Sequence, residues 1–146
     1  VDLPEGRVAA LVEALGSDFE VDEEALRRAA RERSSWNVFH GQPFTKLDLF
    51  MLREGPFDAS EFARRRSLEV RPGQRLFVKS PEDTVLRKLL WFRQGGEVSE
   101  RQWRDVVQVL RQSGAVLDAD YLDAWAGQIG VDALLTRARR EAEWCA

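Results

Sequence analysis

Two runs of hydrophobic residues with interspersed polar ones, rich in aromatic and aliphatic side chains, flank the short loop Gly41-Gln42-Pro43, which is the pattern of a β-hairpin. The two-residue period of a strand puts aliphatic side chains on one face of the second run: Leu47, Leu49 and Met51. The other face carries charged and aromatic side chains: Phe44, Lys46, Asp48 and Phe50. A carboxylate among apolar residues costs free energy unless something pairs with it or binds it. Asp48 is therefore either an acid paired with Lys46 or a nearby arginine, or a ligand for a metal ion.

The spacing of hydrophobic residues, together with capping and turn residues, predicts the other elements up to residue 79. They are a helix over 4–15, a short strand over 18–21, a helix capped by Asp22 that ends near Arg33, a helix over 57–66, and a strand, turn and strand over 67–79. From Ser80 onward the period is helical throughout. Ser80-Pro81-Glu82-Asp83 combines a capping hydroxyl, a proline at the first helical position and two acids in the first turn.

Four helices are predicted after residue 79. The first ends at Gly95-Gly96, the second runs from Ser99 to Gly114, the third opens at Asp118 or Asp120, and the last covers 131–144. Strands followed by a run of helices favour an α+β fold. We therefore expect an α/β part over 1–79 and a helical bundle over 80–146.

Composition narrows the classes of function. The 146 residues carry a net charge of −3, which gives no general attraction to nucleic acid or acidic membranes. One cysteine, Cys145, and one histidine, His40, exclude an internal disulfide and a cysteine- or histidine-rich metal site within the chain. No apolar run approaches 18 residues and no signal peptide is visible, so a cytoplasmic protein without membrane contact is expected.

Several charged side chains have both an ordinary and a functional interpretation. Lys88 lies on the flank of an apolar helical stripe, where lysines commonly cover the core with their aliphatic stems. Arg101 and Asp105 are four residues apart, as in a helix-surface ion pair, although Asp105 is also placed to face a cleft. The run Arg64-Arg65-Arg66 is either a solvated helix end or a phosphate clamp.

The order of several motifs resembles one family over nearly the whole chain, from about Pro4 to Ala142. The matching stretches are Ser35-Trp36-Asn37-Val38-Phe39-His40, Lys46-Leu47-Asp48-Leu49-Phe50, Phe57-Asp58 with Glu61-Phe62-Ala63-Arg64-Arg65, Lys79-Ser80-Pro81-Glu82-Asp83 with Lys88-Leu89, and the run from Gly96 to Val106. In this respect the chain is similar to the nucleotidyltransferase-like proteins related to the toxin halves of bacterial abortive-infection toxin–antitoxin pairs.

The resemblance implies a mixed sheet flanked by helices, followed by a helical bundle. In such proteins two acids on one strand and a third acid on a neighbouring strand bind Mg²⁺ and a nucleoside triphosphate (NTP). Asp48 matches the third acid, and Asp2 is the candidate metal ligand from the pair. Lys88 matches a catalytic position, and the positions assigned to binding the nucleotide are Lys46, Arg104 and Asp105.

The family's glycine-rich turn and complete acid pair are missing ahead of the first helix. Val1-Asp2-Leu3 leads straight into Pro4, so we expect a truncated strand and the rest of the pair upstream of Val1. Two hypotheses follow. The first is Mg²⁺-dependent transfer of a nucleotidyl group from an NTP to an acceptor such as RNA or protein. The second is a catalytically inactive scaffold that binds another protein, either a cognate antitoxin or a second copy of the chain.

Overall fold

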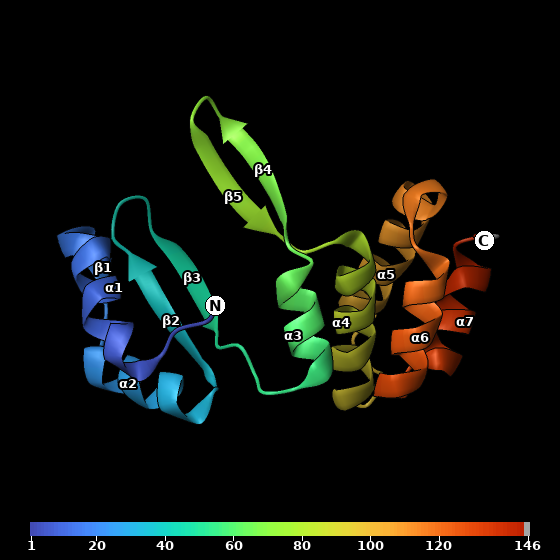
Figure 1. The fold of residues 1–146 in the computed structure, drawn as a ribbon, viewed down its shortest axis with the longest axis horizontal. Helices are drawn as coiled ribbons and strands as arrows, with labels where there is room; N and C mark the ends of the chain where they lie inside the picture. Colours follow the sequence, from blue (N-terminus) through green and yellow to red (C-terminus); the bar gives the residue numbers. More distant parts are fainter. Residues whose placement is uncertain (145–146) are drawn as a thin grey trace. The chain divides into compact units, whose positions relative to one another are not determined.

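The computed structural model describes residues 1–144 and has an α+β architecture, as the strands followed by a run of helices predict (Figure 1). Its chain divides into two compact units, Val1–Ala59 and Ser60–Ala146. The sequence had predicted a division at residue 79. The structure instead groups the hairpin that follows residue 65 with the helical part of the chain. Cys145 lies outside the described residues.

The first unit contains one antiparallel sheet with the strand order β1-β2-β3. Its elements are a 3₁₀ turn Glu5–Arg7, α1 Val8–Leu15, a 3₁₀ turn Gly16–Asp18, β1 Phe19–Glu20, α2 Glu23–Glu32, β2 Ser35–His40 and β3 Thr45–Phe50. The predicted hairpin is confirmed as β2–β3, and Asp22 caps α2 as predicted, accepting a hydrogen bond of 2.9 Å from the N–H of Ala25.

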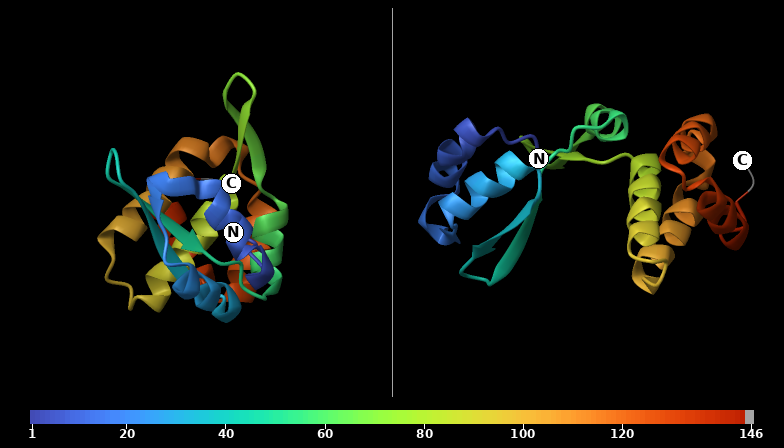
Figure 2. Two further views of the ribbon diagram at one scale, coloured as in Figure 1. Left: turned by 90° about the vertical axis from the view of Figure 1, so that its left-hand side faces the viewer. Right: turned by 90° about the horizontal axis from the view of Figure 1, so that it is seen from below.

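Helices α1 and α2 cover one face of this sheet (Figure 2). The strand period sends Leu49 and Met51 into the core, as the sequence predicts, together with Val38 of β2. The helices contribute the remaining buried residues: Val8, Leu26, Ala29 and Ala30. The opposite side of β3 carries Lys46, Asp48 and Phe50, all exposed, and we call these three residues the open face of β3.

The second unit combines a separate two-stranded sheet with four longer helices. Its elements are β4 Arg66–Arg71, β5 Gln74–Val78, α4 Pro81–Gln94, α5 Glu100–Ser113, a 3₁₀ turn Gly114–Val116, α6 Ala119–Ile129 and α7 Asp132–Glu141. Helix α3, Pro56–Ala63, spans the boundary between the units. It ends earlier than residue 66, where the sequence placed its end, because Arg66 pairs with Val78 as the first residue of β4.

The helix caps follow the sequence closely. Ser80 and Ser99 cap α4 and α5 through their hydroxyls, and Asp118 rather than Asp120 caps α6. The last helix ends at Glu141, ahead of the predicted end at residue 144. Within the described residues, no helix combines the length and apolar character needed to cross a membrane.

Candidate functional site

Asp48 lies on the open face of β3, directly opposite Asn37 of β2. Its Oδ1 is 2.9 Å from Nζ of Lys46, and each side chain keeps 40–50% of its surface in solvent, 42% for Asp48 and 50% for Lys46. The ion-pair interpretation of Asp48 is therefore confirmed. Because water screens an exposed pair, the contact contributes little to stability. The carboxylate remains accessible to a ligand.

Asp2 follows a residue that pairs with the free edge of β3. The amino group of Val1 donates to the carbonyl of Phe50 at 2.6 Å, and the N–H of Leu52 donates to the carbonyl of Val1 at 2.8 Å. This is the hydrogen-bond pattern of a parallel pair between Val1 and Met51. By this register Asp2 is level with Leu52, on the same side of the sheet as Asp48 but four residues further along, about 13 Å at 3.3 Å per residue.

The fit of Mg²⁺ to these residues can be tested from the donor set. The described residues contain no group of three histidine, cysteine or acidic side chains placed to hold a metal ion. The described residues therefore do not form a metal site built from protein ligands alone, or a two-metal site. Mg²⁺ usually keeps several waters and binds through one or two carboxylates plus substrate phosphates. The exposed oxygen of Asp48 fits that simpler role.

Lys88 and Asp105, predicted separately from the sequence, meet between α4 and α5. Nζ of Lys88 lies 2.7 Å from Oδ2 of Asp105 and 3.2 Å from Oε1 of Gln102. The hydrogen bond from Lys88 lowers the pKa of Asp105 below its usual value; partial burial opposes this shift, and the charges of Lys88, Arg101 and Arg104 add to it. The partner of Asp105 is therefore on the neighbouring helix, in place of the ion pair with Arg101 that the spacing indicated.

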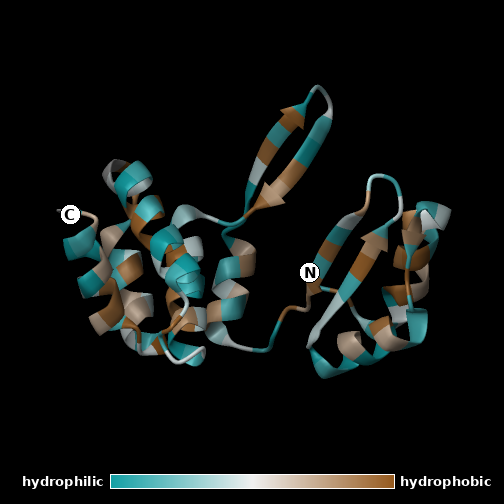
Figure 3. Ribbon diagram, turned by 180° about the vertical axis from the view of Figure 1, so that it is seen from behind, coloured by the Kyte–Doolittle hydropathy of each residue, from teal (hydrophilic) through white to brown (hydrophobic). Residues whose placement is uncertain are grey.

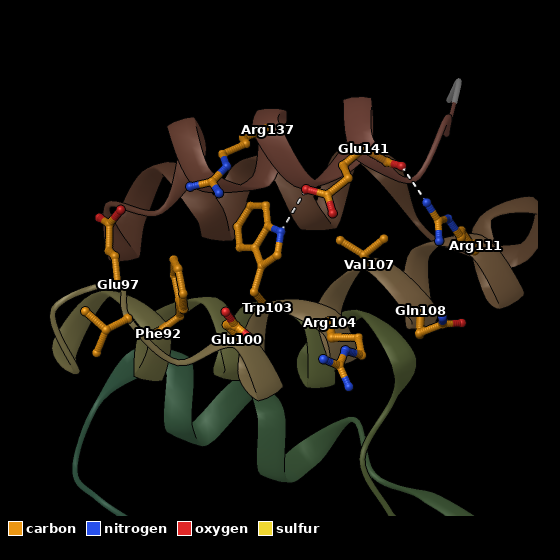
Figure 4. Close-up of a pocket in the computed structure, with 11 residues that line it drawn as sticks. Phe92, Glu97, Glu100, Trp103, Arg104, Val107, Gln108, Arg111, Arg137 and Glu141 are labelled. Carbon is orange, nitrogen blue, oxygen red and sulfur yellow. Dashed lines mark hydrogen bonds between the residues drawn. The ribbon is translucent and has the colours of Figure 1, made fainter.

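Arg104, the residue before Asp105, lines a groove of about 300 Å³ between α5 and α7 (Figure 4). Trp103 forms its floor, with its ring centroid 5.2 Å from that of Phe92. The indole N–H of Trp103 donates to Oε2 of Glu141 at 2.8 Å, and the guanidinium of Arg137 lies 4.1 Å from the indole centroid. The structure thus separates neighbouring residues of α5: Asp105 faces α4, whereas Arg104 faces this groove.

A buried ionic cluster was not predicted as a unit. Glu61 of α3 is 6% exposed and pairs with Arg87 of α4, with Nη2 2.5 Å from Oε2. Lys79 Nζ lies 2.5 Å from the other oxygen of Glu61. Isolated charges are rarely buried, because they lose hydration that only a close partner can offset. No local pattern indicates this pairing, since Glu61 and Arg87 lie on different helices 26 residues apart.

The acids in the first turn of α4 belong to the same region. Asp83 is fully buried and accepts hydrogen bonds from the hydroxyls of Tyr121 at 2.6 Å and Ser80 at 2.7 Å. Burial acts to raise the pKa of Glu82, but hydrogen bonds from backbone N–H groups, including that of Asp118, together with the Ser80 side chain and the charge of Arg64, hold the pKa below its usual value. Both acids were predicted only as favourable charges at a helix start. Their burial depends on α6, which the local pattern does not specify.

The comparisons with known proteins leave this picture unchanged. No protein-family model matches the chain, and neither the curated proteins nor the solved structures contain a match. Of the predicted site residues, the structure brings together Lys46 with Asp48, and Lys88 with Asp105, whereas Arg104 faces the groove between α5 and α7. It places Asp2 on the side of the sheet that Asp48 occupies, at a different level.

Proposed function

We propose that the chain is a nucleotidyltransferase-like protein that binds an NTP with Mg²⁺ at the open face of β3. The observation that carries this proposal is the parallel pairing of Val1 with Met51, which sets the segment of Asp2 beside the strand of Asp48. The resemblance implies acids on two neighbouring strands that face the same side, and this register supports that arrangement.

Register also indicates where a further acid would fit. In a chain that continues ahead of Val1, an acid two positions before Asp2 would be level with Phe50. It would then lie only two residues, about 7 Å along the strand, from Asp48 and on the same face. Such a placement is compatible with the resemblance, which implies a pair of acids on one strand and a third acid on a neighbouring strand.

The side chains on this face have distinct proposed roles. Asp48 offers an exposed carboxylate oxygen as a metal ligand, and Lys46 offers a flexible ammonium group for phosphate oxygens. Bound Mg²⁺ would supply positive charge to the phosphates during transfer. Lys88 and Asp105 belong to the second unit, whereas Asp48 and Lys46 share one strand of the first unit with the segment of Asp2 beside it, so nucleotide binding is proposed at Asp48 and Lys46.

Titration calorimetry with ATP, GTP, CTP and UTP, each with and without Mg²⁺, tests this proposal. We expect Mg²⁺-dependent binding of at least one nucleotide, weakened tenfold or more in Asp48→Asn. Glu20→Gln is the matched control, because Glu20 is an exposed acid on β1 of the same sheet. Equal binding by Asp48→Asn and wild type contradicts the proposal. Binding of no nucleotide also contradicts it and leaves the catalytically inactive scaffold as the hypothesis to pursue.

A further inference from the structure

The segment 64–79 differs in charge from the rest of the chain. It contains six basic residues and one acid, Glu69, whereas the whole chain has a net charge of −3. The basic residues are Arg64, Arg65, Arg66, Arg71, Arg75 and Lys79. The segment forms the β4–β5 hairpin and its two flanks. A local excess of positive charge on an acidic protein indicates a polyanionic partner.

Half of these cations are already paired within the second unit. Arg64 lies 3.5 Å from Glu82, Arg66 lies 3.9 Å from the same carboxylate, and Lys79 lies 2.5 Å from Glu61. Their charges balance buried acids, so they do not account for an external partner.

The other three cations face solvent along the hairpin. Arg75 is 4.0 Å from Glu69, the one acid of the hairpin, and both side chains are more than half exposed. Arg65 and Arg71 have no carboxylate partner among the residues that the structure describes. The Nε of Arg75 also donates to the hydroxyl of Ser67 at 2.8 Å. Arg65, Arg71 and the exposed Nη groups of Arg75 are therefore available to phosphate groups, which a guanidinium can bind through two parallel hydrogen bonds.

An exposed aromatic ring lies beside two of these arginines, Arg65 and Arg75, whereas Arg71 is opposite Gln74 on the other face of the hairpin. Phe77 keeps 67% of its surface in solvent, although it is an apolar residue in a strand. The guanidinium of Arg65 lies 5.4 Å from its ring centroid and 3.2 Å from that of Phe62. Arg75 is two positions before Phe77 on β5, so both side chains project from the same face of the hairpin. An accessible ring flanked by arginines is the arrangement on which unpaired bases stack.

No other strand among the described residues pairs with β4 or β5, so the hairpin has two free edges. Figure 3 shows the alternation of hydrophilic and hydrophobic residues along it. Its second face carries half-exposed aliphatic residues, Leu68, Val70 and Leu76, which by themselves would suit a protein partner. The excess of arginine and the exposed phenylalanine favour nucleic acid.

We propose that the β4–β5 hairpin binds single-stranded nucleic acid. Phe77 stacks on a base, and Arg65, Arg71 and Arg75 neutralise neighbouring phosphates. This proposal is independent of nucleotide binding at Asp48, since it involves residues of the second unit alone. A variant that loses nucleotide binding at Asp48 should therefore keep single-strand binding at the hairpin, and the reverse should hold for hairpin variants.

Fluorescence anisotropy with labelled 12-nucleotide oligo-uridine, oligo-thymidine and a 12-base-pair duplex tests the proposal. We expect both single strands to bind more tightly than the duplex, because a paired base is not free to stack on Phe77. Three neutralised phosphates give a slope of about −2 in log K against log salt, or about twentyfold weaker binding at 200 mM than at 50 mM salt. A preference for oligo-uridine would assign RNA as the ligand. Absence of binding at 50 mM salt, or equal binding of the duplex, overturns the proposal.

Variants separate stacking from charge. Phe77→Leu, which keeps an apolar side chain, should weaken single-strand binding about tenfold with little change in salt slope. Arg71→Gln should reduce the magnitude of the slope by about 0.7. Arg140→Gln, at an exposed position of α7, is the matched control and should bind as wild type does. Unchanged binding by Phe77→Leu overturns the proposal. A competition experiment with polyglutamate gives a second test. If polyglutamate displaces the oligonucleotide and binds wild type and Phe77→Leu with equal affinity, the proposal is overturned and the hairpin binds an acidic protein instead.

Discussion

The ammonium group of Lys88 on α4 lies 2.7 Å from the carboxylate of Asp105 on α5. Seventeen residues separate the two in sequence, and the intervening turn returns the chain so that the helices pack together. Val106 and Leu110 of α5 are fully buried, which fixes the helix orientation and holds Asp105 toward Lys88. The ion pair is thus a consequence of apolar packing more than its cause.

Lys88→Met should raise the pKa of Asp105 toward its usual value, because the hydrogen bond from Lys88 is the main cause of the lowered pKa. A folded-state pKa below the unfolded one gives stability that is present above the unfolded pKa and lost as pH falls through the folded pKa. Asp105 is 41% exposed, so we expect the variant to change the unfolding free energy by less than about 1 kcal/mol. Carboxylate NMR titration measures the pKa. No change from wild type would show that Lys88 does not control it.

Glu61→Ala should destabilise the protein by about 3–5 kcal/mol, because it removes the buried carboxylate that pairs with the guanidinium of Arg87 and the ammonium group of Lys79. The double variant Glu61→Met, Arg87→Met removes both charges and should recover most of that loss. Urea unfolding of the wild type, each single variant and the double variant gives the comparison. A double variant as unstable as Glu61→Ala would show that the buried pair contributes net stability.

Tyr121 offers a direct optical measurement, because it is the only tyrosine in the sequence. Burial, with the hydrogen bond to Asp83, raises its pKa to about 12 from a usual value of 10. Since the folded-state pKa is the higher one, this stabilisation is complete below pH 10 and is lost as pH rises toward 12. Phenolate absorbance should therefore appear near pH 12 in the folded protein and near pH 10 in urea. If the Tyr121 phenol of the folded protein instead ionises near pH 10, the prediction is contradicted and the phenol is accessible to solvent.

Ser80→Ala should lower the unfolding free energy by about 1 kcal/mol or more. The hydroxyl of Ser80 accepts from the N–H of Asp83 at 3.1 Å, which caps α4, and donates to the buried carboxylate of Asp83 at 2.7 Å. Ser99→Ala is the control at the cap of α5, where the corresponding bond is 3.4 Å long and less buried. We expect the smaller loss there. Equal losses at both sites would show that the contact with Asp83 adds nothing to capping.

Local rules were enough to predict most elements of the fold. Asp22, Ser80 and Ser99 have the side chains that cap helices, and the two-residue period of β3 separated Leu49 from Asp48 correctly. These features depend on residues within one turn or one strand. Helix ends with no cap signal were less accurate, because pairing of Arg66 with a distant residue, Val78, decides where α3 stops.

Side-chain partners between distant elements could not be predicted in the same way. The sequence allowed the run Arg64-Arg65-Arg66 to be a solvated helix end or a phosphate clamp. Arg64 is the least exposed residue of this run. In the structure it lies over the ring of Tyr121, 3.8 Å from the centroid, and 3.6 Å from Asp83. Arg64 is therefore held by partners that the sequence did not indicate, whereas Arg65 and Arg66 are exposed. The contact requires α3, α4 and α6 to meet, and no local pattern encodes that meeting.

Nucleotide binding at the open face of β3 is the central claim, and paramagnetic NMR tests it most directly. Mn²⁺ in place of Mg²⁺, added together with the tightest-binding NTP, should broaden the backbone signals of Asp48 and Asn37 first, since these residues are opposite each other in the sheet. The same addition to Asp48→Asn should leave those signals sharp. Nucleotide-dependent broadening centred on another element, or none at all, would contradict the assignment of the metal and nucleotide to Asp48.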